Sequence, residues 1–92
     1  MADHRETISV SSLLRTGAGQ LMGFSITAAA GAPKATFDDS VDGTGTVIYE
    51  VYVSYLTNVT IFFPDRFAPF FTDGLYLTLD ADLTATVWWR DL

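Results

Sequence analysis

The residues from Thr44 to Leu56 alternate between two faces with a period of two, and this pattern constrains the fold more than any other in the chain. Apolar and aromatic side chains occupy the whole of one face, namely Val47, Tyr49, Val51, Val53 and Tyr55. The other face mixes Glu50 and Ser54 with large side chains. β-branched and aromatic residues suit a pleated, half-buried surface. We therefore expect a central strand, with Val51 buried in the core.

A strand of this length needs partners on both sides, because buried backbone amides must be hydrogen-bonded. Strand-like alternation recurs in segments 7–14, 21–30, 34–38, 58–63, 75–79 and 83–90. Glycine, proline and aspartate punctuate the intervals, and no convincing amphipathic helix is present. We expect an all-β protein, a single antiparallel β-sandwich of seven or eight strands over residues 7–92. The polar residues 1–6 read as an N-terminal arm.

The composition indicates a small domain that associates with itself. Of the 92 residues, 49% are hydrophobic and only 17% are charged, although a chain of this size exposes much of its surface. Cysteine is absent, so neither disulfides nor thiolate metal sites stabilise the fold. Contacts between subunits are the remaining common means of stabilising such a domain. We expect a homo-oligomer.

Charge and hydropathy argue against several partners. The net charge is −6 and the five basic residues are scattered, which disfavours nucleic acid and anionic membrane surfaces. No run approaches the roughly 18 apolar residues of a membrane span. Segment 21–32 has a basic residue upstream and small residues downstream, as signal sequences do, but Gly23, Ser25 and Thr27 share one face of a strand. We favour the strand.

Catalytic constellations are weak. His4 is the only histidine and lies in the expected arm, so a nucleophile–base system would depend on a mobile terminus. The carboxylate pairs Asp80–Asp82 and Asp38–Asp39 fall in or beside turns, where aspartate commonly caps the backbone. We expect no catalytic residues, no cofactor and no enzymatic activity.

One loop has part of a calcium-binding pattern. Asp38, Ser40 and Asp42-Gly43 occupy positions one, three, five and six of a calcium-loop register, but Tyr49 replaces the bidentate glutamate at position twelve. We favour an acidic, solvated turn with no metal, and leave bound calcium as an alternative. Asn58-Val59-Thr60 is a glycosylation sequon only if the chain is secreted by a eukaryote.

Aromatic residues supply the candidate interface. At most one ring of Trp88-Trp89 can join the core, because neighbouring residues of a strand point to opposite faces. Aromatic residues and arginine are enriched where interfaces derive their energy. The candidate interface residues are Asp3, His4, Arg5, Arg66, Phe67, Phe70, Phe71 and Trp88. For the loop phenylalanines, burial within their own sandwich is the rival interpretation.

Four pieces of the chain together resemble a known family. They are residues 15–24, residues 36–39 followed by 45–48, residues 72–76, and residues 85–90. They combine a glycine turn, an acidic loop before the long strand, and an aromatic strand that ends in a basic residue. In order and spacing they resemble small single-domain virion proteins of tailed bacteriophages, jelly-roll β-sandwiches that decorate capsids. The aromatic loop 64–71 and the Trp88-Trp89 pair depart from that pattern.

The resemblance implies a viral structural protein without enzymatic activity. Such a capsid decoration, or cement, protein would bind the major capsid protein on the outer surface of the virion as a trimer, after synthesis in the host cytoplasm. The alternative is a carbohydrate- or receptor-binding module of a phage fibre or tail, in which Trp88 or Trp89 stacks against a sugar.

Overall fold

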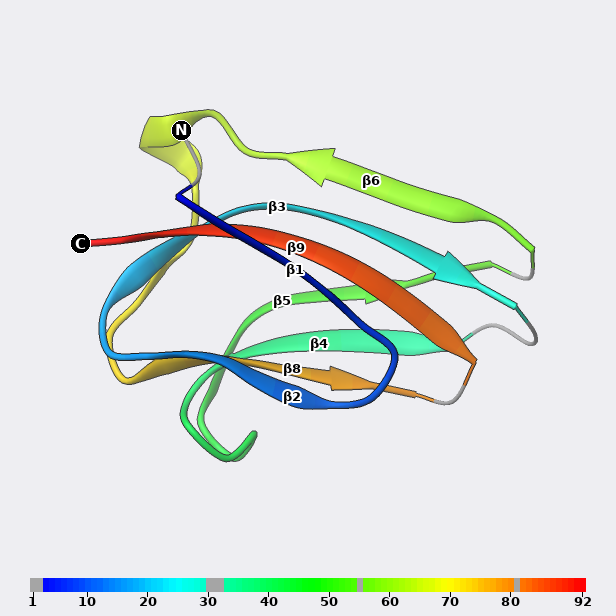
Figure 1. Cartoon of the computed structure of the whole chain (residues 1–92), viewed down its shortest axis with the longest axis horizontal. Coiled ribbons are helices and arrows are strands. Elements are labelled where there is room, and N and C mark those ends of the chain that lie inside the picture. Colours follow the sequence, from blue (N-terminus) through cyan, green and yellow to red (C-terminus); the bar gives the residue numbers. More distant parts are fainter. Residues whose placement is uncertain (1–2, 30–32, 55, 81) are drawn as a thin grey trace.

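The computed structural model describes residues 3–29, 33–54, 56–80 and 82–92, which form two antiparallel sheets packed face to face (Figure 1). The strands are β1 (His4–Ile8), β2 (Ser12–Thr16), β3 (Gly19–Ala28), β4 (Lys34–Asp39), β5 (Thr46–Tyr52), β6 (Asn58–Phe62), β7 (Phe70–Phe71), β8 (Gly74–Leu79) and β9 (Leu83–Asp91). One sheet has the order β1-β9-β3-β6, with β7 also pairing with β3, and the other has the order β2-β8-β4-β5. The expected all-β sandwich is confirmed, with nine strands rather than seven or eight.

Helical structure is confined to one 3₁₀ turn, η1 (Asp65–Phe67), within the described ranges. None of the helical structure in those ranges is long and apolar enough to cross a membrane.

The core lies between the sheets and follows the expected alternation in most strands. Phe24 of β3 and Phe37 of β4 are fully buried, and their ring centroids lie 5.1 Å apart across the sheet–sheet interface. β9 pairs with β3 along nearly its whole length and contributes four buried residues, Leu83, Ala85, Val87 and Trp89. The inward faces predicted for segments 75–79 and 83–90 are confirmed. In segment 21–30 the prediction holds from Phe24 to Ala28, but a bulge between Leu21 and Gly23 places Leu21, and not Met22, in the core cluster.

The strand expected at the centre lies instead at an edge. β5 pairs with β4 alone among the described strands, and Val51 is half-buried against the core rather than fully buried. A bulge opposite Phe37 and Asp38 places one extra residue in β5. Beyond this bulge the alternation is inverted, so that Ile48 packs against the core and Val47 is 52% exposed. Tyr55 lies outside the described residues.

The N-terminal segment also differs from expectation. Segment 7–14 is split between two strands, because β1 belongs to one sheet and β2 to the other. Residues 4–6, which we assigned to a free arm, pair with β9 from His4↔Trp89 to Glu6↔Val87. Their polar side chains resemble an arm in sequence because β1 is an exposed edge strand.

The bulge in β5 gives a direct test of the fold. Ile48→Ser should lower the free energy of unfolding by about 1–3 kcal/mol, because a side chain that contacts the core becomes polar. Val47→Ser should change it by less than about 0.5 kcal/mol, because the side chain faces solvent. Urea denaturation of both variants measures the difference. If the strand alternated regularly from Val47 to Val53, Val47→Ser would lower the free energy of unfolding more than Ile48→Ser.

Candidate functional site

Two aromatic rings pack together on the outer face of the first sheet. Phe62 of β6 and Trp88 of β9 both lie opposite Gly23 of β3, and their ring centroids are 4.9 Å apart. A Cβ atom at Gly23 would collide with the ring of Phe62 and approach the carbonyl oxygen of Ile61 to 2.8 Å. Glycine therefore leaves the space in which the two rings meet. Phe62 remains 59% exposed.

The two adjacent tryptophans point to opposite faces of β9, as predicted. Trp89 lies in the core and is 6% exposed, whereas Trp88 is half-buried on the outer face. Phe62 was absent from our candidate interface residues. The sequence nonetheless indicated that Phe62 is exposed. The alternation of segment 58–63 places Phe62 and Thr60 on the outer face of the strand and Val59 on the inner face.

The segment from η1 to β7 carries two more exposed rings. Phe67 and Phe70 are 67% and 57% exposed, and the guanidinium carbon of Arg66 lies 5.1 Å from the ring centroid of Phe67. Phe71 is wrongly placed among the candidates, since it is fully buried. β7 pairs with Gly19 and Gln20 of β3, and this pairing turns Phe71 into the core while Phe70 faces outward.

A buried glutamine holds this loop against the sheet. The side-chain nitrogen of Gln20 donates hydrogen bonds to the carbonyl oxygens of Asp65 (2.9 Å) and Ala68 (3.1 Å). Its side-chain oxygen accepts a hydrogen bond of 2.6 Å from Nε of Arg90. Gln20 is 1% exposed, so these bonds satisfy a polar group that would otherwise be costly to bury. Phe67 thus stands on a fixed loop. We call Phe62, Phe67, Phe70 and Trp88 the aromatic surface.

The N-terminal candidates lie at the opposite edge of the same sheet. Arg5 pairs with Trp88 in the β-ladder and is exposed, as is Asp3. The ring of His4 stacks on Trp89 with centroids 5.4 Å apart, and its Nε2 lies 3.0 Å from Oδ2 of Asp91. The structure therefore brings Arg5 and Trp88 together, while His4 secures β1 to the end of β9.

The acidic loop is held by its own hydrogen bonds. Oδ1 of Asp42 accepts hydrogen bonds from the amide (3.0 Å) and the hydroxyl (2.6 Å) of Thr44, and Oγ of Ser40 accepts one of 2.9 Å from the amide of Gly43. The hydroxyl and then the amide of Thr44 lower the pKa of Asp42. The described part of the chain contains no cluster of three or more acidic, histidine or cysteine side chains arranged to bind a metal. Ser40 and Asp42 thus cap the backbone of their own loop.

Asp39 joins this loop to the turn before β8. Its carboxylate accepts hydrogen bonds from the amides of Thr72 (2.9 Å), Asp73 (2.8 Å) and Gly74 (3.3 Å), and from the hydroxyl of Thr72 (3.0 Å). Burial acts to raise the pKa of Asp39, but these hydrogen bonds outweigh it and lower that pKa below 3.8.

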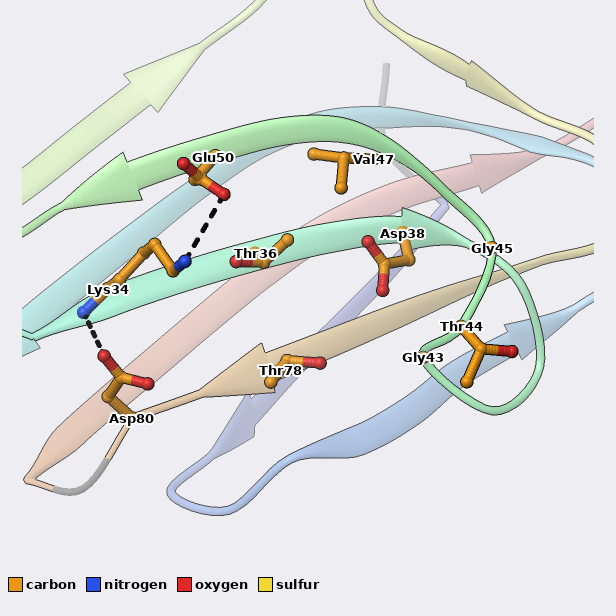
Figure 2. A pocket seen from close by; sticks show the side chains of 10 residues that line it. All are labelled: Lys34, Thr36, Asp38, Gly43, Thr44, Gly45, Val47, Glu50, Thr78 and Asp80. Atoms are coloured by element: carbon orange, nitrogen blue, oxygen red, sulfur yellow. Dashed lines mark hydrogen bonds and ion pairs between the residues drawn. The ribbon is translucent and has the colours of Figure 1, made fainter.

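A polar groove of about 450 Å³ lies on the outer face of the second sheet. Figure 2 shows its lining residues, which come from β4, β5, β8, the loop that follows β4 and the turn that follows β8. The lining residues are Lys34, Thr36, Asp38, Gly43, Thr44, Gly45, Val47, Glu50, Thr78 and Asp80. Sequence reasoning missed this groove, because its residues are brought together only by the pairing of three strands.

Comparisons with known proteins provide no family. No family model matches the chain, and no curated protein matches its sequence. One similar solved structure is the cryo-EM structure of a virus-like particle of extra small virus from the giant freshwater prawn Macrobrachium rosenbergii. The similarity covers 97% of this chain and 80% of that chain, with 15% identity and a TM-score of 0.42. Values this low support no conclusion about fold or function.

Asp39 gives a pH-dependent prediction. Because its pKa is lowered in the folded protein, its stabilising contribution is present above its unfolded pKa of 3.8 and is lost as the pH falls through the folded pKa. Asp39→Ala should cost about 1–3 kcal/mol near neutral pH, since it leaves the turn amides without their acceptor. Urea denaturation at several pH values should show the difference from the native protein shrinking in acid. A pH-independent difference would contradict this role.

Proposed function

We propose that this protein is a non-enzymatic structural protein of a virion, which binds to a capsid as a homo-oligomer and strengthens it. The observation that carries the proposal is the aromatic surface, because Phe62, Phe67 and Phe70 are each more than half exposed on a small sandwich. Exposed apolar surface that includes several aromatic rings is typical of a surface that binds another protein. The sequence resemblance to capsid decoration proteins supplies the kind of partner.

The rigid support of the aromatic surface favours a role in binding a protein over a role in catalysis. Gln20 fixes the carbonyl oxygens of Asp65 and Ala68, and Gly23 accommodates the ring of Phe62, so binding need not order a flexible loop. A preorganised surface loses less conformational entropy when it docks. If many copies bind over a capsid lattice, the aromatic surface of each copy would add binding free energy across the boundaries between capsid subunits.

Charge supports the same function. The net charge of −6 makes free copies repel one another, which limits nonspecific aggregation through exposed rings before the partner is met. Arg66 beside Phe67 and Arg5 beside Trp88 place positive charge next to the rings. Arginine and aromatic residues are both enriched at protein interfaces.

A carbohydrate-binding module of a fibre or tail is the second candidate. Polar side chains next to the Phe62–Trp88 pair favour it, because Ser25, Asn58 and Thr60 form a hydrogen-bonded row on the same outer face. A ring flanked by hydroxyl and amide groups suits a sugar. Glycan-array binding by the purified protein would support this candidate, and binding to capsids alone would support the first.

The first prediction of the proposal concerns self-association. Light scattering of the purified protein should give a mass near three times the 10.1 kDa of one chain. A closed cyclic trimer would bury apolar surface that a monomer exposes. A mass of one chain at every concentration would contradict the oligomer.

The second prediction concerns the aromatic surface. The double variant Phe67→Ser with Phe70→Ser should change the free energy of unfolding by less than about 0.5 kcal/mol, because both side chains are exposed. It should weaken binding to capsids that lack the protein by about tenfold or more, as the loss of interface rings does. Co-sedimentation with capsids measures this binding.

Tyr52→Ser is the matched control. Tyr52 is also an exposed aromatic residue, at 66%, but it lies on β5 of the other sheet. Its substitution should leave capsid binding unchanged. Equal loss in both variants would place the contact elsewhere, and full binding by the double variant would remove the loop from the interface.

A further inference from the structure

The groove on the second sheet contains a carboxylate that lacks a partner. Asp38 is 4% exposed, and its Oδ1 accepts no hydrogen bond from any residue that the structure describes. Burial raises the pKa of this carboxyl group. Figure 2 shows the side chain pointing into the space between β4, β8 and the loop that carries Gly43. A buried carboxylate of this kind is costly unless a donor or a cation reaches it.

Several other polar groups of the groove already have hydrogen-bond or ion-pair partners within the protein. Asp80 accepts a hydrogen bond of 2.8 Å from the backbone amide of Lys34, and the ammonium group of Lys34 lies 3.7 Å from Glu50. Three of the lining side chains are acidic and one is basic. The groove therefore has an excess of negative charge, and Asp38 is the least exposed of its three carboxylates.

Shape and composition narrow the chemistry of the occupant. The volume of about 450 Å³ suits one extended side chain or a small ligand. Among the described residues that line the groove there is no aromatic ring, which disfavours a stacked sugar. Val47 is the one large apolar side chain in the lining, and the β5 bulge turns it outward into this site. It offers a contact for an aliphatic stem.

The loop over the groove is shaped by two glycines. Gly43 has a φ of +83°, which favours glycine, and a Cβ at Gly45 would collide with the carbonyl oxygen of Asp39. The capping bonds of Ser40 and Asp42 hold the loop in this conformation without involving Asp38. The loop thus forms a wall of the groove and leaves the carboxylate of Asp38 unpaired.

We propose that this groove binds the side chain of an arginine presented by a protein partner. The guanidinium group would donate hydrogen bonds to Asp38, the hydroxyl groups of Thr36 and Thr78 would accept others, and Val47 would contact the stem. A guanidinium donates charge-assisted hydrogen bonds to carboxylates and is less strongly hydrated than an ammonium, which suits a shielded acceptor. This site is separate from the aromatic surface and does not depend on the proposed function.

The test is an NMR titration of the full chain with acetyl-arginine amide at constant ionic strength, which follows the backbone amides around Asp38, Gly43 and Thr78. These amides should shift and saturate. Acetyl-citrulline amide has nearly the same shape without the charge and should leave them unchanged. Equal shifts with citrulline, or none with arginine, would overturn the proposal.

Two variants locate the site. Asp38→Asn should weaken binding about tenfold or more, because it removes a charge-assisted hydrogen bond from a shielded position. Lys34→Ala should bind acetyl-arginine amide at least as tightly, because it removes the competing cation. If the Asp38 variant does not fold, Thr78→Lys provides the same test, since its ammonium group would occupy the groove. Unaltered binding by the Asp38 variant, or by Thr78→Lys if that replaces it, would refute the site.

Other occupants give distinct outcomes. Calcium chloride that shifts the same amides more strongly than acetyl-arginine amide would identify a cation site and overturn the proposal. Shifts that depend on protein concentration in the absence of any ligand would identify a second copy as the occupant and overturn the choice of a foreign partner.

Discussion

The contact between Phe24 and Phe37 is the interaction on which the rest of the molecule depends. Each ring projects from an inner strand of its sheet, since β3 lies between β9 and β6 and β4 lies between β8 and β5. Tyr49 of the edge strand β5 and Phe63, which directly follows the edge strand β6, pack around Phe24 with centroids 5.5 and 6.3 Å away. Truncation of a buried phenylalanine costs about 3–5 kcal/mol, and whole domains are stable by only about 5–15 kcal/mol. Both outer surfaces are therefore supported by one cluster of rings.

The fold was largely predictable because most of its strands are regular. The alternation of segment 83–90 appears unchanged in the burial of β9, and that of segment 21–30 holds in β3 from Phe24 to Ala28. β5 was misjudged because an edge strand and a central strand have the same alternation when one face is covered. The bulge that exposes Val47 depends on the register with Phe37 and Asp38, and no local residue choice in β5 reveals it.

The functional surfaces were harder to predict, since they depend on contacts between distant segments. Asp38 and Asp39 are neighbours with the same side chain, yet one is an unpaired acceptor in a groove and the other holds the turn before β8. Phe70 and Phe71 separate in the same way, because the two-residue strand β7 is too short to leave a pattern. Only the tryptophan pair was resolved in advance, since its strand is long enough for period-two alternation to decide.

The pairing of β1 with β9 has a consequence for how the chain folds. β1 is synthesised before its ladder partner, which lies more than 70 residues later, from Ala85 to Trp89. One edge of β3 likewise has no hydrogen-bonding partner until β9 has been synthesised. Ladders between such distant segments are slow to form, and all-β domains rich in them fold in milliseconds to seconds. During translation the first sheet must therefore remain open, with two hydrogen-bonding edges exposed to other nascent chains, until its last strand leaves the ribosome.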